Sequence, residues 1–104
     1  KMRKVINGKI YDTEKAILLA EDWNGLGSGD FNYFVEQLYI TKKGSFFLYG
    51  SGGALSIYSE SNGRESWGIS KIIPLTNEET FDWLEGNGET EIIEEYFEDW
   101  IEEA

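Results

Sequence analysis

Between Phe34 and Ile73 the sequence alternates short runs of aromatic and β-branched residues with clusters of glycine and polar residues. Runs of this length, bounded by turn-forming residues, are typical of strands in an antiparallel sheet. We expect strands at residues 34–41, 45–49, 54–59 and 67–73, with turns at 42–44 and 50–53. Pro74 is expected to end the last strand. A meander of three or four strands is therefore the centre of the predicted fold.

The N-terminal segment carries a hairpin signal followed by a helix signal. Asn7-Gly8 stands between β-branched residues, and a two-residue turn of this kind needs positive φ at both positions, which predicts a β-hairpin. Asp12 or Thr13 is then suited to cap a helix that runs to about Trp23. The apolar stripe of this expected helix consists of Ala16, Ile17 and Ala20, and Asn24-Gly25 is its expected C-cap.

Two further helices are expected after Pro74. Thr76-Asn77-Glu78-Glu79 matches a capping box and predicts a helix to Glu85. Thr90 is the expected cap of a last helix from Glu91 to about Glu103. The predicted class is α+β: an antiparallel meander sheet of three to four strands plus an N-terminal β-hairpin, packed with about three helices, the last strongly acidic.

The length of 104 residues corresponds to a single compact domain, residues 1–104, and we find no repeat and no linker. Because Lys1 precedes Met2, we expect Lys1 to be a remnant of expression and Met2 the natural start. No apolar run approaches the roughly 20 residues of a membrane helix, and no segment has the pattern of a signal peptide. We therefore expect a cytoplasmic protein.

Several kinds of chemistry are missing from the sequence. Cysteine and histidine are absent, which removes disulfides, thiolate nucleophiles, Cys/His zinc sites and imidazole bases. The glycines at 50–53 lack the Lys-Ser/Thr ending of a phosphate-binding loop, and those at 25–29 lack the dinucleotide spacing. No stretch matches a calcium loop. We expect no enzymatic activity, no cofactor and no metal site.

Charge is distributed very unevenly along the chain. Residues 1–71 carry 9 basic and 8 acidic residues, whereas residues 72–104 carry 12 acidic residues and no basic one, within a net charge of −11. Such a polarised field attracts a positively charged partner. It also disfavours direct binding of nucleic acid through the acidic half, because phosphates are bound by Lys and Arg.

A continuous helix over residues 91–103 would place apolar and acidic residues on opposite sides. Five like-charged pairs at i,i+4 would then cost roughly 1–2.5 kcal/mol in total at low salt. Acidic pairs would recur about every 6 Å, close to the spacing of phosphates along a nucleic-acid strand. We therefore predict a partner-binding surface that imitates nucleic acid, made of Asp82, Glu85, Glu89, Glu91, Glu94, Glu95, Glu98, Asp99, Glu102 and Glu103.

Two simpler interpretations apply to parts of this surface. An acidic tail that only keeps a small protein soluble accounts for the same composition equally well. Glu78 and Glu79 are explained by helix capping and by the helix dipole.

Four stretches, residues 4–13, 38–50, 52–58 and 72–76, resemble a family of small proteins from mobile elements and phages of Firmicutes, and the similarity runs from about Arg3 to Phe97. Such proteins include type II-A anti-CRISPR inhibitors of Cas9. The resemblance implies that the partner is Cas9 in a bacterial host cell, whose positively charged channel holds the guide–target duplex. Blocked guide RNA loading or blocked DNA engagement would follow.

Two alternatives remain open at this stage. One is an acidic DNA mimic directed at another DNA-binding protein of the host, such as a restriction enzyme or a repressor. The other is a non-enzymatic regulatory module that forms a homodimer through the apolar side of the last helix.

Overall fold

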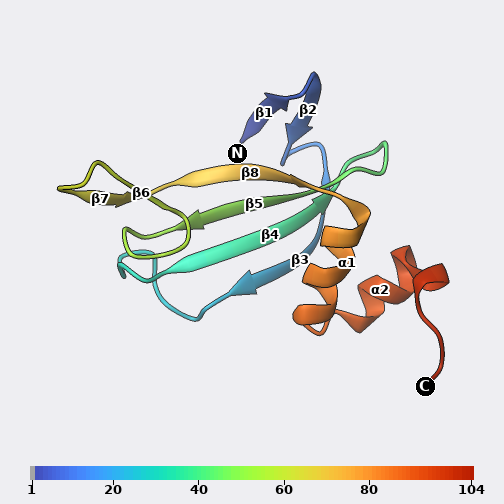
Figure 1. Cartoon of the computed structure of the whole chain (residues 1–104). Helices are drawn as coiled ribbons and strands as arrows, with labels where there is room; N and C mark the ends of the chain where they lie inside the picture. The colour runs from blue at the N-terminus through green and yellow to red at the C-terminus, as the bar shows by residue number, and fades with distance from the viewer. Residues whose placement is uncertain (1) are drawn as a thin grey trace.

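A four-stranded antiparallel sheet forms the centre of the computed structural model, which describes residues 2–104 (Figure 1). Its order is β3-β4-β5-β8, with β3 at Ile17–Trp23, β4 at Phe34–Ile40, β5 at Phe46–Gly52 and β8 at Ser70–Leu75. Two hairpins complete the strands: β1 (Arg3–Ile6) with β2 (Lys9–Asp12), and β6 (Ser59–Ser61) with β7 (Ser66–Gly68). The helices are α1 (Asn77–Gly86) and α2 (Thr90–Tyr96), followed by the 3₁₀ turn η1 (Glu98–Trp100). The predicted α+β class and the antiparallel sheet are confirmed.

Each face of the sheet carries its own hydrophobic cluster. On the face covered by α1 and α2, which we call the helix face, Leu38, Phe46 and Leu48 pack with Leu84 and with residues of the C-terminal helices. On the opposite side, the hairpin face, the buried cluster consists of Tyr11, Tyr39, Phe47 and Ile72. The helices and the β1–β2 hairpin therefore cover opposite sides of one sheet.

The Asn-Gly hairpin forms as the sequence predicts. Asn7 and Gly8 have φ of 51° and 77°, the positive values that the tight turn requires. Tyr11 then packs edge-on against Phe47, with ring centroids 5.4 Å apart, and Phe47 stacks on Tyr39 at 5.2 Å. These aromatic contacts fix the hairpin on the sheet.

The helix expected from residue 12 or 13 to Trp23 is wrong. Residues 13–16 form a turn and residues 17–23 form β3, which pairs with β4. The pairing register shifts between Leu18 and Ala20, so a bulge places Leu19 beside the core of the helix face. The bulge interrupts the alternation of a strand and leaves apolar residues at spacings that resemble a helix. Asn24-Gly25 accordingly caps no helix.

The turn expected at residues 50–53 and the strand expected at residues 54–59 are also wrong. β5 continues through Gly50 to Gly52, and residues 54–58, expected to be a strand, form a turn that folds over it. A Cβ on Gly50 would overlap the ring of Tyr58, and one on Gly52 would overlap Ser56 Oγ. These glycines therefore permit close packing on the helix face, and the strand is not broken at Gly50.

The expected strand at residues 67–73 is two strands, β7 and β8, and Pro74 lies within β8. β8 is an edge strand, in which Pro74 pairs with Phe47 of β5. An edge strand tolerates proline because its N–H groups on one side face no neighbouring strand.

Helix α1 begins with the predicted capping box. The Glu79 N–H donates to Thr76 Oγ1 at 3.0 Å, and the Thr76 N–H donates to Glu79 Oε1 at 2.8 Å. The capping interpretation of Glu79 is confirmed.

The acidic last helix is not confirmed as a continuous element. α2 spans seven residues, its N-cap is Glu89 and not Thr90, and no side chain caps it. After Phe97 the chain forms η1 and then an irregular C-terminal segment. Residues 2–104 therefore contain two α-helices and a 3₁₀ turn in place of three helices.

Candidate partner-binding surface

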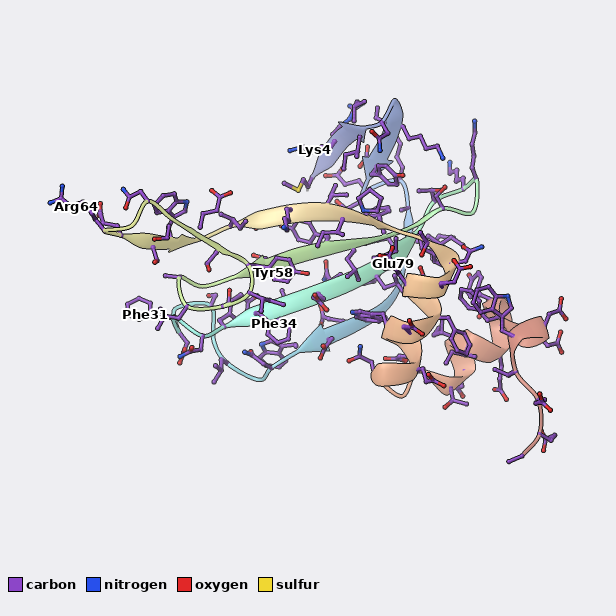
Figure 2. All side chains as sticks on the ribbon, viewed as in Figure 1. Lys4, Phe31, Phe34, Tyr58, Arg64 and Glu79 are labelled. Carbon is purple, nitrogen blue, oxygen red and sulfur yellow. The ribbon has the colours of Figure 1, made fainter. Side chains whose placement is uncertain are left out.

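The predicted acidic residues occupy four consecutive elements at one end of the molecule. Asp82 and Glu85 lie on α1, and Glu89 is the N-cap residue of α2. Glu91, Glu94 and Glu95 lie on α2. Glu98 and Asp99 lie on η1, and Glu102 and Glu103 lie in the C-terminal segment. All are exposed except Glu89, which is half-buried. Figure 2 shows carboxylate oxygens projecting outward from this end. Together these ten residues form what we call the acidic surface.

No cation of the described chain neutralises the acidic surface. The last basic residue in the sequence is Lys71, at the start of β8. Within residues 2–104, none of the ten carboxylates forms an ion pair. The negative charge is therefore left for solvent ions or for another molecule.

The end of α2 at Tyr96 removes most of the expected repulsion. Of the five like-charged pairs at i,i+4, only Glu91/Glu95 lies entirely within a helix. Its cost is about 0.2–0.5 kcal/mol, well below the roughly 1–2.5 kcal/mol of a continuous helix. The regular spacing of acidic pairs along a helix axis is likewise absent after Phe97. The exposure of these carboxylates and the absence of nearby basic residues support the prediction of uncompensated charge. Repulsion between carboxylates within a helix contributes little to it.

An aromatic cluster explains why the chain leaves the helix. Phe97 is 3% exposed, and its ring lies 5.5 Å from Phe46, 5.7 Å from Phe81 and 5.0 Å from Trp100. Phe97 has φ −133° and ψ 33°, outside the helical region, which allows η1 to turn Trp100 back over Phe81 at 5.4 Å. Packing of these rings fixes the direction of the segment that carries Glu98 to Glu103.

Tyr96 connects the acidic surface to this core. Its ring meets Phe46 edge-on at 6.1 Å. Burial raises the pKa of the Tyr96 phenol, and the charge of Glu95 and a hydrogen bond to its carboxylate raise it further. The phenol therefore stays protonated at neutral pH and is a donor for Glu95.

A carboxylate that sequence reasoning missed holds α1 against the sheet. Glu36 of β4 lies on the helix face and accepts hydrogen bonds from Trp83 Nε1 at 2.8 Å and from the Tyr58 hydroxyl. Burial, followed by the Glu36 hydrogen bond and charge, strongly raises the pKa of Tyr58. The signal in the sequence was a glutamate between Phe34 and Leu38, at an inward position of an alternating strand.

The free half of the hairpin face forms a groove of about 450 Å³. Trp23 and Tyr33 both line it, and Trp23 is 56% exposed. Along its floor the Tyr39 hydroxyl donates to Gln37 Oε1 at 3.1 Å, and Gln37 Nε2 donates to Glu21 Oε2 at 2.8 Å. These polar groups are satisfied by one another, and the groove is not continuous with the acidic surface.

Within residues 2–104, no group of three or more His, Cys, Asp or Glu side chains is arranged to hold a metal ion. In the same part of the chain no helix has the length and apolar character needed to cross a membrane.

Comparisons with protein families, with curated proteins and with solved structures find no match.

Proposed function

We propose that the protein acts by binding and not by catalysis, and that its acidic surface docks on a nucleic-acid-binding surface of another protein. The observation that supports this most directly is a group of ten carboxylates, nine of them exposed, with no ion-pair partner in residues 2–104. A surface built to bind nucleic acid presents Lys and Arg at close spacing, and these side chains are the natural counterparts of such carboxylates.

The charge distribution favours fast, salt-sensitive association. A field of one sign over one end of a small protein orients it during diffusional encounter and raises the association rate. The exposed carboxylates are screened over about 10 Å at 0.1 M salt, so binding should weaken as ionic strength rises.

Cas9 is the partner that we propose, on the basis of the resemblance to type II-A anti-CRISPR proteins. Cas9 holds its guide–target duplex in a positively charged channel and reads the adjacent motif with arginines. An acidic protein that occupies such a surface would prevent guide RNA loading or DNA engagement. The charge argument alone applies equally to another DNA-binding protein of the host.

The packing of α2 weighs against the homodimer alternative. Ile93 and Phe97, expected on the apolar side of the last helix, are buried within the chain itself. Trp100 and Ile101 are 46% and 42% exposed. Two partly exposed side chains offer far less than the roughly 800 Å² per subunit of a standard interface.

Charge reversal with a matched control tests the proposal. Glu94→Lys with Glu98→Lys changes the charge by the same amount as Glu60→Lys with Glu65→Lys, and the control pair lies in the β6–β7 hairpin region. We expect the first double variant to bind Cas9 at least about tenfold more weakly, a loss of about 1.4 kcal/mol, and the control to bind normally. Equal binding by both variants would show that the acidic surface is not the docking site.

Co-purification with Cas9, with and without guide RNA, at low and high salt identifies the step. Binding to guide-free Cas9 alone would indicate blocked guide loading, and binding to the guided complex alone would indicate blocked DNA engagement. Failure to bind Cas9 in either form, combined with salt-sensitive capture of a different DNA-binding protein, would reassign the partner.

A further inference from the structure

Four lysines from three separate segments surround one pocket beside the β1–β2 hairpin. The pocket has a volume of about 580 Å³ and lies where the β1–β2 hairpin meets the β4–β5 turn. Figure 1 shows these two segments at the same end of the sheet, with β6 and β7 at the other end. Lys9 follows the hairpin turn, Lys15 lies in the turn before β3, and Lys42 and Lys43 form the β4–β5 turn.

Tertiary packing, and not sequence proximity, brings these lysines together. Tyr11 of β2 packs on Phe47 of β5, which sets the hairpin beside the end of β4. Lys9 and Lys42 are more than 30 positions apart in the sequence, yet both line the same pocket. In a chain with a net charge of −11, four of the nine basic residues therefore gather around a single space.

The charge of these lysines is not neutralised by the protein. Asp12 is the one carboxylate among the lining residues. Its Oδ2 lies 3.9 Å from Arg3 Nε, and its Oδ1 accepts the Glu14 N–H at 2.9 Å. In residues 2–104 none of the four lysines forms an ion pair or a side-chain hydrogen bond. The four exposed ammonium groups are therefore available to an anion that enters the pocket.

We propose that this lysine pocket binds a phosphate group of a nucleotide or a nucleic-acid strand. Lysine ammonium groups bind phosphate as point charges from any direction, and several of them match an anion of more than one charge. The side-chain hydroxyl of Ser45, which lines the pocket and forms no hydrogen bond in the described chain, is an additional donor. The volume lies in the range of small-molecule sites. This site lies outside the acidic surface and does not depend on the function proposed for it.

Titration of the ¹⁵N-labelled protein tests the proposal at constant ionic strength. Sodium pyrophosphate and a single-stranded tetranucleotide are added separately while the backbone amide signals of Lys9, Lys42 and Lys43 are followed by NMR. Saturable shifts at these amides are expected. Pyrophosphate binding alone identifies a free phosphorylated compound as the ligand, and tighter binding of the tetranucleotide identifies a nucleic-acid backbone.

Matched variants give the control. Lys42→Gln with Lys43→Gln should weaken binding at least about tenfold, whereas Arg64→Gln with Lys71→Gln removes the same charge outside the pocket and should leave binding unchanged. Figure 2 shows Arg64 at the far tip of the β6–β7 region. The lysines are exposed or flank exposed turns, so thermal unfolding should be the same for both variants.

Three results would overturn the proposal. The first is the absence of saturable shifts with either phosphate compound. The second is equal binding by both double variants, or equal shifts with sodium acetate, which would show unspecific ion attraction. The third is a shift that depends on protein concentration and is lost when Glu98, Asp99, Glu102 and Glu103 are changed to Gln, because the lysines would then bind the acidic surface of a second copy.

Discussion

The indole N–H of Trp83 on α1 donates a 2.8 Å hydrogen bond to the carboxylate of Glu36 on β4. The hydroxyl of Tyr58, from the loop that covers β5, donates to the same carboxylate. Three segments distant in the sequence therefore meet at one side chain, and this contact holds in place the helix from which the acidic surface begins.

Replacing Glu36 should destabilise the fold more than its partial exposure implies. Glu36→Ala leaves the Trp83 N–H and the Tyr58 hydroxyl without an acceptor, and an unpaired buried donor costs about 1–3 kcal/mol. We expect a loss of about 2–5 kcal/mol in the free energy of unfolding, measured by urea titration. Tyr58→Phe, which removes one donor and leaves the Trp83 bond, should cost only about 0.5–1.5 kcal/mol. A loss below about 0.5 kcal/mol in Glu36→Ala would contradict this role.

The ring of Tyr58 lies on Gly50 and leaves no room for a side chain at position 50. Gly50→Ala inserts a methyl group into the position of the ring, so a loss of about 1–3 kcal/mol is expected from the displacement. Gly27→Ala is the matched control, since no heavy atom lies within 4 Å of its Cβ position. Thermal unfolding of both variants should show a lower midpoint for Gly50→Ala alone. Equal midpoints would mean that Tyr58 moves aside without cost.

The raised pKa of Tyr58 predicts a loss of stability in alkali. Burial, and then the Glu36 carboxylate, make the phenolate unfavourable in the folded chain, so its folded pKa lies above the unfolded value of 10. The unfolded state therefore releases its proton first, and stability that is complete below about pH 10 falls as pH rises further. Tyr39 and Tyr96 are shifted in the same direction.

Comparison with Tyr58→Phe isolates the contribution of this residue. Above pH 10 the free energy of unfolding of the original protein should fall more steeply than that of the variant, by up to about 1.4 kcal/mol per pH unit. Urea titrations at several pH values between 9 and 11.5 measure both slopes. Parallel slopes would show that Tyr58 titrates equally in both states.

Phe97 should contribute far more to stability than its position near the C-terminus implies. Its ring contacts Phe46, Phe81 and Trp100 and is almost fully buried, so Phe97→Ala should cost about 3–5 kcal/mol. Trp100→Ala, which removes a ring that is nearly half exposed, should cost clearly less. If denaturant unfolding gives Phe97→Ala the smaller effect, the C-terminal segment does not pack on α1 as described.

Local signals in the sequence predicted the parts of the fold that depend on local chemistry. The Asn7-Gly8 turn and the capping box at Thr76 and Glu79 form as expected, because each is specified by neighbouring residues. β4 and the turn after it also agree, since their alternation is regular.

The incorrect predictions fall where tertiary contacts override a local pattern. A bulge at Leu18–Ala20 makes β3 resemble a helix, and Tyr58 packs on Gly50, where the sequence pattern resembles a strand end. Phe97 leaves an otherwise helical pattern to join an aromatic cluster. In the candidate sites, composition identified the acidic surface, but the lysine pocket needs contacts between turns that no local pattern encodes.

Because the helix α2 ends at Tyr96, the stability of the protein should depend only weakly on salt concentration. With α2 ending at Tyr96, one like-charged i,i+4 pair remains in a helix, so screening should recover well under 1 kcal/mol from this source. A continuous helix over residues 91–103 would recover roughly 1–2.5 kcal/mol from five such pairs. Urea unfolding at 20 mM and 500 mM NaCl measures this effect. The comparison is between the original protein and a variant in which Glu94, Glu98, Glu102 and Glu103 are changed to Gln.

Cα chemical shifts of residues 97–103 give an independent result: non-helical values are expected. Helical values together with a large salt effect specific to the original protein would show that the acidic residues form one helix in solution, which would restore the regular carboxylate spacing that the present arrangement lacks.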